Sequence, residues 1–231
     1  LSLASFLKIC HQSDPYLSDC IKQSVNSLKP YLRKGIPALG IPKCEPLHLD
    51  EIEIDQSSVC IFLYLYLQLL TFSSRKKENL IFLARLLDLD KNVIRLKLFI
   101  PRLEMVSNYV MDGRIMMLSI TGNGLGHGNF TDIDVIVTIQ MERYLNERTG
   151  SIHQSVDDIY VDFEIGHATV HLDNLFDGDE MLSGAMNLFL NDNWSTIIAE
   201  IRPKLEETIA MLIMKFTNTI FSLFPENVLL P

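Results

Sequence analysis

The sequence lacks the features that mark a membrane-spanning or a nucleic-acid-binding protein. Its longest apolar run, residues 59–72, has 14 residues, whereas a membrane-spanning helix needs ~20. Lys and Arg number 20 against 29 Asp and Glu, and the resulting net charge of −9 repels phosphate backbones. We therefore expect no nucleic-acid binding and no stable insertion into a membrane.

Motifs of catalysis and metal binding are missing too. The chain has no Gly-x-Ser-x-Gly elbow and no His-Glu-x-x-His helix. His167 and His171 lie in a strand pattern, where residues four apart are separated by ~13 Å, too far for a metal pair. The glycine-rich residues 122–128 do not match a phosphate-binding loop, and we interpret them as a flexible turn or bulge between strands. We expect no enzyme activity, no catalytic residue, no metal and no cofactor.

Four cysteines, all within the first 60 residues, bear on the cellular compartment. They allow three full pairings, and none has the spacing of a metal site. Because Cys10 and Cys20 flank a turn-rich segment, we favour a short disulfide between them, which would contribute ~2–3 kcal/mol. Asn129 and Asn193 begin two sequons that are compatible with glycosylation. Together these features favour secretion.

Hydrophobic periodicity divides the chain into a helix, a long run of strands and a second helix. Apolar side chains on one face predict a helix over about residues 15–34. From about 47 to 175 apolar and polar residues alternate, which predicts an antiparallel sheet with one buried face. Apolar residues then recur every three or four positions over 192–224, which predicts a helix of ~45–50 Å.

A long antiparallel sheet must curl to hide its apolar face, and a long amphipathic helix offers a rod for it to curl around. Hydrophobic residues make up 48% of the chain and the mean hydropathy is +0.18, both high for a globular protein of this charge. This architecture permits an internal tunnel in place of a filled core, although periodicity alone does not require one.

Several motifs stand in a fixed order along nearly the whole chain. They are residues 9–15 (Ile-Cys-His-Gln-Ser-Asp-Pro), 17–21, 34–37 and 45–47 near the start, 113–115 with 120–124 in the centre, and 174–178 with 189–194 near the end. In this order they resemble the motifs of the insect takeout family, which is related to the haemolymph juvenile hormone binding proteins. The likeness runs from about residue 6 to 225.

The resemblance implies an α+β fold of the tubular lipid-binding superfamily, in which a strongly curved antiparallel sheet, a super-roll, wraps a long C-terminal helix. It implies a single takeout-like domain over residues 1–231, a disulfide between Cys10 and Cys20, and an internal hydrophobic tunnel. The hormone carriers proper have a second disulfide to the C-terminal helix, whereas no cysteine follows Cys60 here. Takeout is therefore the nearer resemblance. Cys44 and Cys60 are extra to its pattern, and either pair with each other or stay as buried thiols.

The function implied by the resemblance is that of a carrier in haemolymph or another extracellular fluid. The expected partner is a long hydrophobic molecule such as a fatty acid, a terpenoid of the juvenile hormone kind or a quinone-like lipid. Tunnel-lining side chains should come from the sheet and the long helix. We expect them to be Leu65, Leu67, Leu96, Leu98, Val135, Val137, Ile198, Ile201, Leu205, Ile209 and Phe216.

Three other functions are weighed against carriage. A receptor-contacting signalling protein with a filled core and no obligate ligand is the main alternative. Lipid exchange at a membrane surface is a variant of carriage, for which the basic turn at residues 75–77 would attract headgroups. An esterase acting on hydrophobic hormones is disfavoured, because no nucleophile–base arrangement is visible in the sequence.

Overall fold

The computed structural model describes residues 8–43, 47–48, 52–56, 59–68, 81–88, 92–116 and 118–231. The chain begins with helix α1 (Leu17–Lys34) and a short 3₁₀ helix η2 (Pro37–Leu39). The strands described are β1 (Leu47–His48), β2 (Ile52–Gln56), β3 (Val59–Gln68), β4 (Ile81–Asp88), β5 (Val93–Ile115), β6 (Leu118–Asn146) and β7 (Ser151–Leu172). After them come η3 (Phe176–Gly178), α2 (Glu180–Asp192), α3 (Trp194–Leu223) and α4 (Glu226–Leu229).

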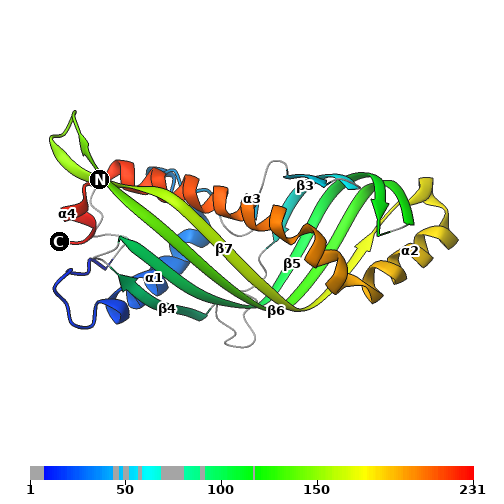
Figure 1. Cartoon of the computed structure of the whole chain (residues 1–231), viewed down its shortest axis with the longest axis horizontal. Helices are drawn as coiled ribbons and strands as arrows, with labels where there is room; N and C mark the ends of the chain where they lie inside the picture. Colours follow the sequence, from blue (N-terminus) through cyan, green and yellow to red (C-terminus); the bar gives the residue numbers. More distant parts are fainter. Residues whose placement is uncertain are drawn as a thin grey trace.

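The strands form one antiparallel sheet in which β5, β6 and β7 are long neighbours. Its order is β1-β3-β5-β6-β7, with β2 added to β3 and β4 added to β5. The sheet twists along its length and arches over near α2, while α3 runs lengthwise along it (Figure 1). The predicted α+β fold, a curved antiparallel sheet around a long C-terminal helix, is confirmed.

Along β6 and β7, the residues that face inward switch between even and odd positions at a line that crosses both strands. On β6, buried side chains stand at even positions up to Phe130 and at odd positions from Ile133 onward. Asp132, between them, has a φ of 54° and is left out of the pairing with both neighbouring strands. On β7 the same change occurs across Gly166, where an added Cβ would lie 2.8 Å from the Asp132 Cβ. The register of the three strands is the same on both sides of this line, which divides the inner surface into two halves.

The interpretation of residues 122–128 as a turn is wrong, because they lie within β6. Gly124 pairs with Tyr109 of β5, and a Cβ on Gly124 would lie only 2.7 Å from the Asp173 carbonyl oxygen. A Cβ on Gly122 would lie 3.0 Å from the Tyr109 hydroxyl and 3.0 Å from Leu175. Glycine occupies these inward positions because neighbouring backbone and a buried aromatic ring approach too closely for any side chain.

Two buried clusters fill the two halves of the inner surface. In the half near α2, Tyr109, Ile120 and Leu175 are buried and pack against the first half of α3. The second half of α3 packs over the other cluster. That cluster consists of Val137, Ile139, Met141, Val156, Ile159 and Val161. One helix therefore covers both halves, as the predicted rod should.

Helix α2, which the periodicity did not reveal, closes the free edge of β7 with asparagine side chains. Asn187 accepts from the Leu172 N–H at 2.8 Å and donates to the Leu172 carbonyl at 3.0 Å. Asn191 makes the same pair of bonds with Val170, at 2.9 and 2.8 Å. Four residues of helix rise ~6 Å and two residues of strand span ~6.7 Å, so the two asparagines match successive outward peptides. The edge is thereby protected from pairing with another chain.

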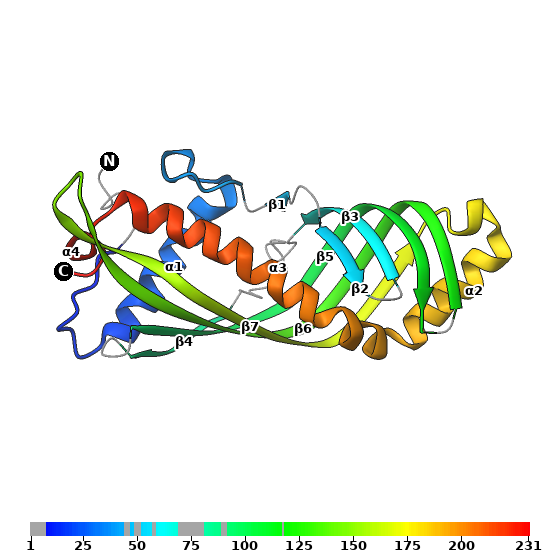
Figure 2. The same ribbon diagram turned by 45° about the horizontal axis from the view of Figure 1, so that its top comes forward.

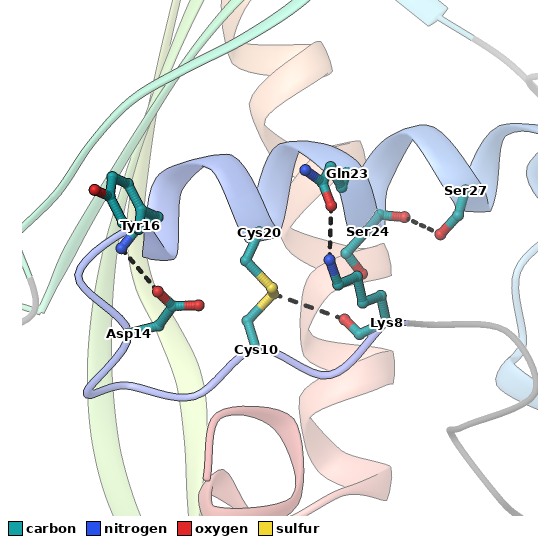
Figure 3. The surroundings of a disulfide bond; sticks show 8 residues. All are labelled: Lys8, Cys10, Asp14, Tyr16, Cys20, Gln23, Ser24 and Ser27. Carbon is teal, nitrogen blue, oxygen red and sulfur yellow. Dashed lines mark hydrogen bonds between the residues drawn. A yellow bond between two sulfur atoms is a disulfide. The ribbon is translucent and has the colours of Figure 1, made fainter.

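The predicted disulfide is confirmed: Cys10 and Cys20 are bonded and tie the segment before α1 to its first turns (Figure 3). Next to it, Lys8 Nζ donates to Gln23 Oε1 at 2.6 Å. The Gln12 N–H donates to the carbonyl of Pro231 at 2.9 Å, which joins the two ends of the described chain. Cys44 and the side chain of Cys60 lie outside the described residues.

Candidate functional site

The candidate site is the apolar surface between α3 and the sheet, and its main feature is incomplete burial. α3 has 30 residues and ~45 Å of length, yet none of them is buried. Ile197, Ile201 and Leu205 face the cluster near α2 but are only half-buried. A helix covering a sheet usually buries its apolar stripe. The stripe on α3 therefore keeps accessible apolar surface although it packs against the two clusters of the sheet.

The sheet surface opposite the second half of α3 shows the same partial burial. Ile94, Leu96 and Leu98 of β5 are half-buried and pack against the cluster around Val137. Val135 of β6 is half-buried as well, whereas Val137 is only 2% exposed. The half-buried residues of β5, β6 and α3 thus pack around the buried cluster and keep part of their surface accessible.

The structure brings together most of the residues expected to line a tunnel. Leu96, Leu98, Val135, Val137 and Ile209 belong to one cluster, and of these five residues all but Val137 are half-buried. Ile201 and Leu205 belong to the other, and Ile198 and Phe216 are half-buried on α3. The backbones of Leu65 and Leu67 pair with Ser107 and Met105 on β5, and their side chains lie outside the described residues. That these residues contact a ligand stays a prediction.

Sequence reasoning missed inner residues that carry the same signal. Ile197 precedes Ile201 by four positions and Ile213 follows Ile209 by four, so the helical period already contained both. Tyr109 gave no such signal. It is 1% exposed, and its hydroxyl donates to the Asp173 carbonyl at 2.5 Å. Burial, with a smaller contribution from the charge of Asp173, raises the pKa of Tyr109 to about 12, so it is neutral at ordinary pH.

Charged groups stand at the border of this surface. Arg202 of α3 lies 5.6 Å from the centroid of the Phe163 ring and pairs with Asp162 of β7. Its Nε donates to Glu206 at 2.7 Å, and this bond, opposed in part by desolvation, raises the Arg202 pKa above its usual value. The contacts of Arg202 with Asp162 and Phe163 hold the first half of α3 against β7. The interior beside them is lined by apolar side chains.

The histidines act as hydrogen-bonding and packing groups where the structure describes them. His171 Nε2 lies 3.2 Å from Asp173 Oδ1, and the His167 ring meets Trp194 edge-on. His153 is buried, and its Nδ1 lies 3.0 Å from the Phe221 carbonyl near the end of α3. Within the described ranges, no three His, Cys, Asp or Glu side chains gather to hold a metal ion. No helix in those ranges is long and apolar enough to cross a membrane.

The two sequon asparagines are half-buried and hydrogen-bonded. Asn129 of β6 accepts from Arg102 Nε at 3.0 Å. Asn193, between α2 and α3, donates from Nδ2 to the Phe189 carbonyl at 2.9 Å. Glycosylation at either residue stays a prediction.

Comparisons with known proteins identify a family model, two relatives and a solved structure that are similar to this chain. Residues 1–231 match the family model described as haemolymph juvenile hormone binding protein. The chain is 24% identical over 227 residues to circadian clock-controlled protein daywake of Drosophila melanogaster, covering 95% of this chain and 85% of that protein. To daywake of Drosophila yakuba it is 21% identical over 211 residues, covering 89% and 81%. The crystal structure of Epiphyas postvittana Takeout 1 shares the fold, with a TM-score of 0.79, 24% identity and coverage of 95% and 97%.

Proposed function

The chain belongs to the haemolymph juvenile hormone binding protein family, takeout-like members included, and we propose that it is a secreted carrier of one long hydrophobic molecule. The ligand would lie in an internal tunnel between α3 and the sheet. Its chemical class would be that of a fatty acid, a terpenoid of the juvenile hormone kind or a quinone-like lipid. We propose further that residues 1–231 form a single binding domain.

The observation that carries this proposal is the absence of any buried residue on α3. A stripe of apolar side chains ~45 Å long faces the apolar side of the sheet, and this stripe is left half-buried together with Ile94, Leu96 and Leu98 of β5. An elongated apolar molecule placed between them would gain ~25 cal/mol for each Å² of apolar surface removed from water. Because helix and sheet are already in position, little ordering would oppose this gain.

The two clusters along α3 bear on the shape of the ligand. One ends near Leu205 and the other begins near Ile209, so the half-buried surface continues past the line at Asp132 and Gly166. A long, narrow molecule lying parallel to α3 would use both halves at once. A compact ligand would use only one of them.

Secretion and the lack of catalysis form part of the same proposal. The Cys10–Cys20 disulfide is typical of proteins from oxidising compartments. The family is one of binding proteins, and the described surface between α3 and the sheet is lined mainly by apolar side chains. Such a lining suits capture and release of an apolar molecule rather than a chemical step.

A charge placed on the inner side of α3 tests the carrier proposal. Leu205→Glu puts a carboxylate into the half-buried stripe, whereas Met211→Glu puts one on the same helix at a residue that is 54% exposed. We expect Leu205→Glu to abolish uptake of a fluorescent fatty acid, because burying the ionised group beside an alkyl chain is costly. Met211→Glu should bind like the wild type. Equal binding by both folded variants, checked by circular dichroism, would contradict the tunnel.

A further inference from the structure

Helix α2 lies at the end of the molecule away from the chain termini (Figures 1 and 2). Several of its apolar side chains are exposed to solvent. Met181 is 84% exposed, Leu188 68% and Leu182 51%. Between them Ala185 is exposed, and a Cβ on Gly184 would meet no atom within 4 Å. We call these five residues the outer α2 face.

This exposure is the reverse of the usual helix arrangement, and the structure shows why. Two asparagines of α2 point inward, where Asn187 and Asn191 hold the edge of β7. Ser183 also points inward, and its hydroxyl donates to the Leu175 carbonyl at 2.7 Å. Met186 and Leu190 supply the buried apolar contacts of the helix. α2 is thus fastened by its inner side, and the outer α2 face is free for an intermolecular contact.

The electrostatic surroundings of the outer α2 face are strongly one-sided. Residues 173–192, from the end of β7 to the end of α2, contain five Asp and Glu and no Lys or Arg. Asp177, Asp179 and Glu180 precede the first turn of α2, or lie in it, and Asp192 ends the helix. Apolar anchors bordered by carboxylates on the same helix form a surface of defined chemistry.

We propose that the outer α2 face docks a protein partner whose surface carries an apolar groove bordered by Lys and Arg. Met181 and Leu188 stand seven positions apart, the spacing at which a helix inserts anchors into a groove. Basic side chains at its rim would meet the carboxylates, speed association and exclude acidic competitors. A second copy of this chain would bring the same carboxylates against them, and an anionic bilayer would repel them. The surface is separate from the inner surface of α3, so docking does not depend on the carrier proposal.

A pair of designed peptides tests this chemistry directly. One is a labelled amphipathic helix with Leu on one face and Lys on the other, and the second has Glu in place of every Lys. Fluorescence anisotropy should show the Lys peptide binding at least ten-fold more tightly than the Glu peptide, with a preference that falls as salt is raised. The double variant Met181→Ser/Leu188→Ser should lose at least ten-fold in affinity for the Lys peptide.

The matched control is another exposed apolar pair on the β6–β7 hairpin. Leu145 is 64% and Ile152 52% exposed, and they pair across the two strands. The variant Leu145→Ser/Ile152→Ser should bind the Lys peptide like the wild type. Equal affinities of the α2 variant and the wild type, or equal binding of both peptides, would overturn the proposal.

The competing occupants give distinct results. Sedimentation that shows a dimer in the wild type but not in Met181→Ser/Leu188→Ser would overturn the proposal in favour of self-association. Flotation with phosphatidylcholine–phosphatidylglycerol vesicles that is lost in the same variant would overturn it in favour of a membrane. Uptake of the fluorescent fatty acid should be unchanged in this variant, so the carrier proposal and the docking proposal can fail separately.

Discussion

Gly124→Ala adds one methyl group at the place where β6 lies closest to the segment after β7. The new Cβ would lie 2.7 Å from the Asp173 carbonyl oxygen and 3.3 Å from its carbon, both of them backbone atoms. That carbonyl accepts the Tyr109 hydroxyl, and the Asp173 N–H donates to the Leu125 carbonyl at 2.9 Å. Asp173 is held from both sides, so it cannot move away without weakening one of these bonds.

The cost of this methyl group follows from those contacts. Overpacking costs ~1–3 kcal/mol, and a weakened hydrogen bond adds ~1 kcal/mol. Alanine lowers the conformational entropy of the unfolded chain, which offsets ~0.5–1 kcal/mol of this loss in folding stability. We expect a net loss of about 2 kcal/mol, which for a chain of this size lowers Tm by ~4–8 °C.

Gly184→Ala is the matched control, since its Cβ meets no atom within 4 Å and its backbone is helical. It should raise the stability by ~0.5–1 kcal/mol through helix propensity. Both variants are compared with the wild type by calorimetry and by urea unfolding. A Gly124→Ala protein as stable as the wild type would refute the close approach as the reason for glycine in β6.

Three further predictions concern the disulfide, the buried tyrosine and the strand edge. The double variant Cys10→Ser/Cys20→Ser, which opens a loop with a sequence separation of 10, should lose ~2–3 kcal/mol in urea unfolding, and an unchanged midpoint would contradict it. The pKa of Tyr109 is about 12 in the fold against 10.0 normally, so the unfolded chain releases this proton first and stability falls between pH 10 and 12, by up to ~1.4 kcal/mol per pH unit. Tyr109→Phe should lack this part of the slope in urea unfolding at pH 9.5–11.5, and identical slopes would exclude the assignment. Asn187→Leu removes both partners of the Leu172 peptide and should cost ~2–4 kcal/mol, with faster hydrogen exchange at the Leu172 amide; unchanged exchange would contradict the role of the side chain.

Periodicity predicted the sheet and the long helix because apolar side chains recur along each element with the period of a strand or of a helix. Leu96, Leu98 and Val135 were assigned to the inner side from simple alternation, and the structure places them there. The inner side changes at Asp132, so alternation read across that residue would assign the wrong side. The change depends on the backbone conformation of this one residue, which cannot be predicted from the pattern of hydrophobic residues.

The wrong interpretation of residues 122–128 and the missing prediction of α2 have a common physical cause. Glycine usually indicates a turn, but in β6 it is needed because Tyr109 and Asp173, from distant parts of the chain, leave no room for a side chain. The inner face of α2 carries Asn187 and Asn191, because their side chains bond to the edge of β7, and apolar residues therefore occur on both faces of the helix. In each case the local sequence is shaped by a tertiary partner, so a local pattern could not reveal the structure.

The carrier account is tested most directly by native mass spectrometry of freshly purified protein, followed by organic extraction and identification of the released compound. The account predicts a stoichiometric, elongated apolar molecule, or binding of one when fatty acids, terpenoids and quinones are offered to emptied protein. Leu205→Glu should remain at the mass of the free protein, and Met211→Glu should bind like the wild type. A wild-type mass that stays free of ligand with every class offered would contradict the account and favour a protein that acts only through its surface contacts.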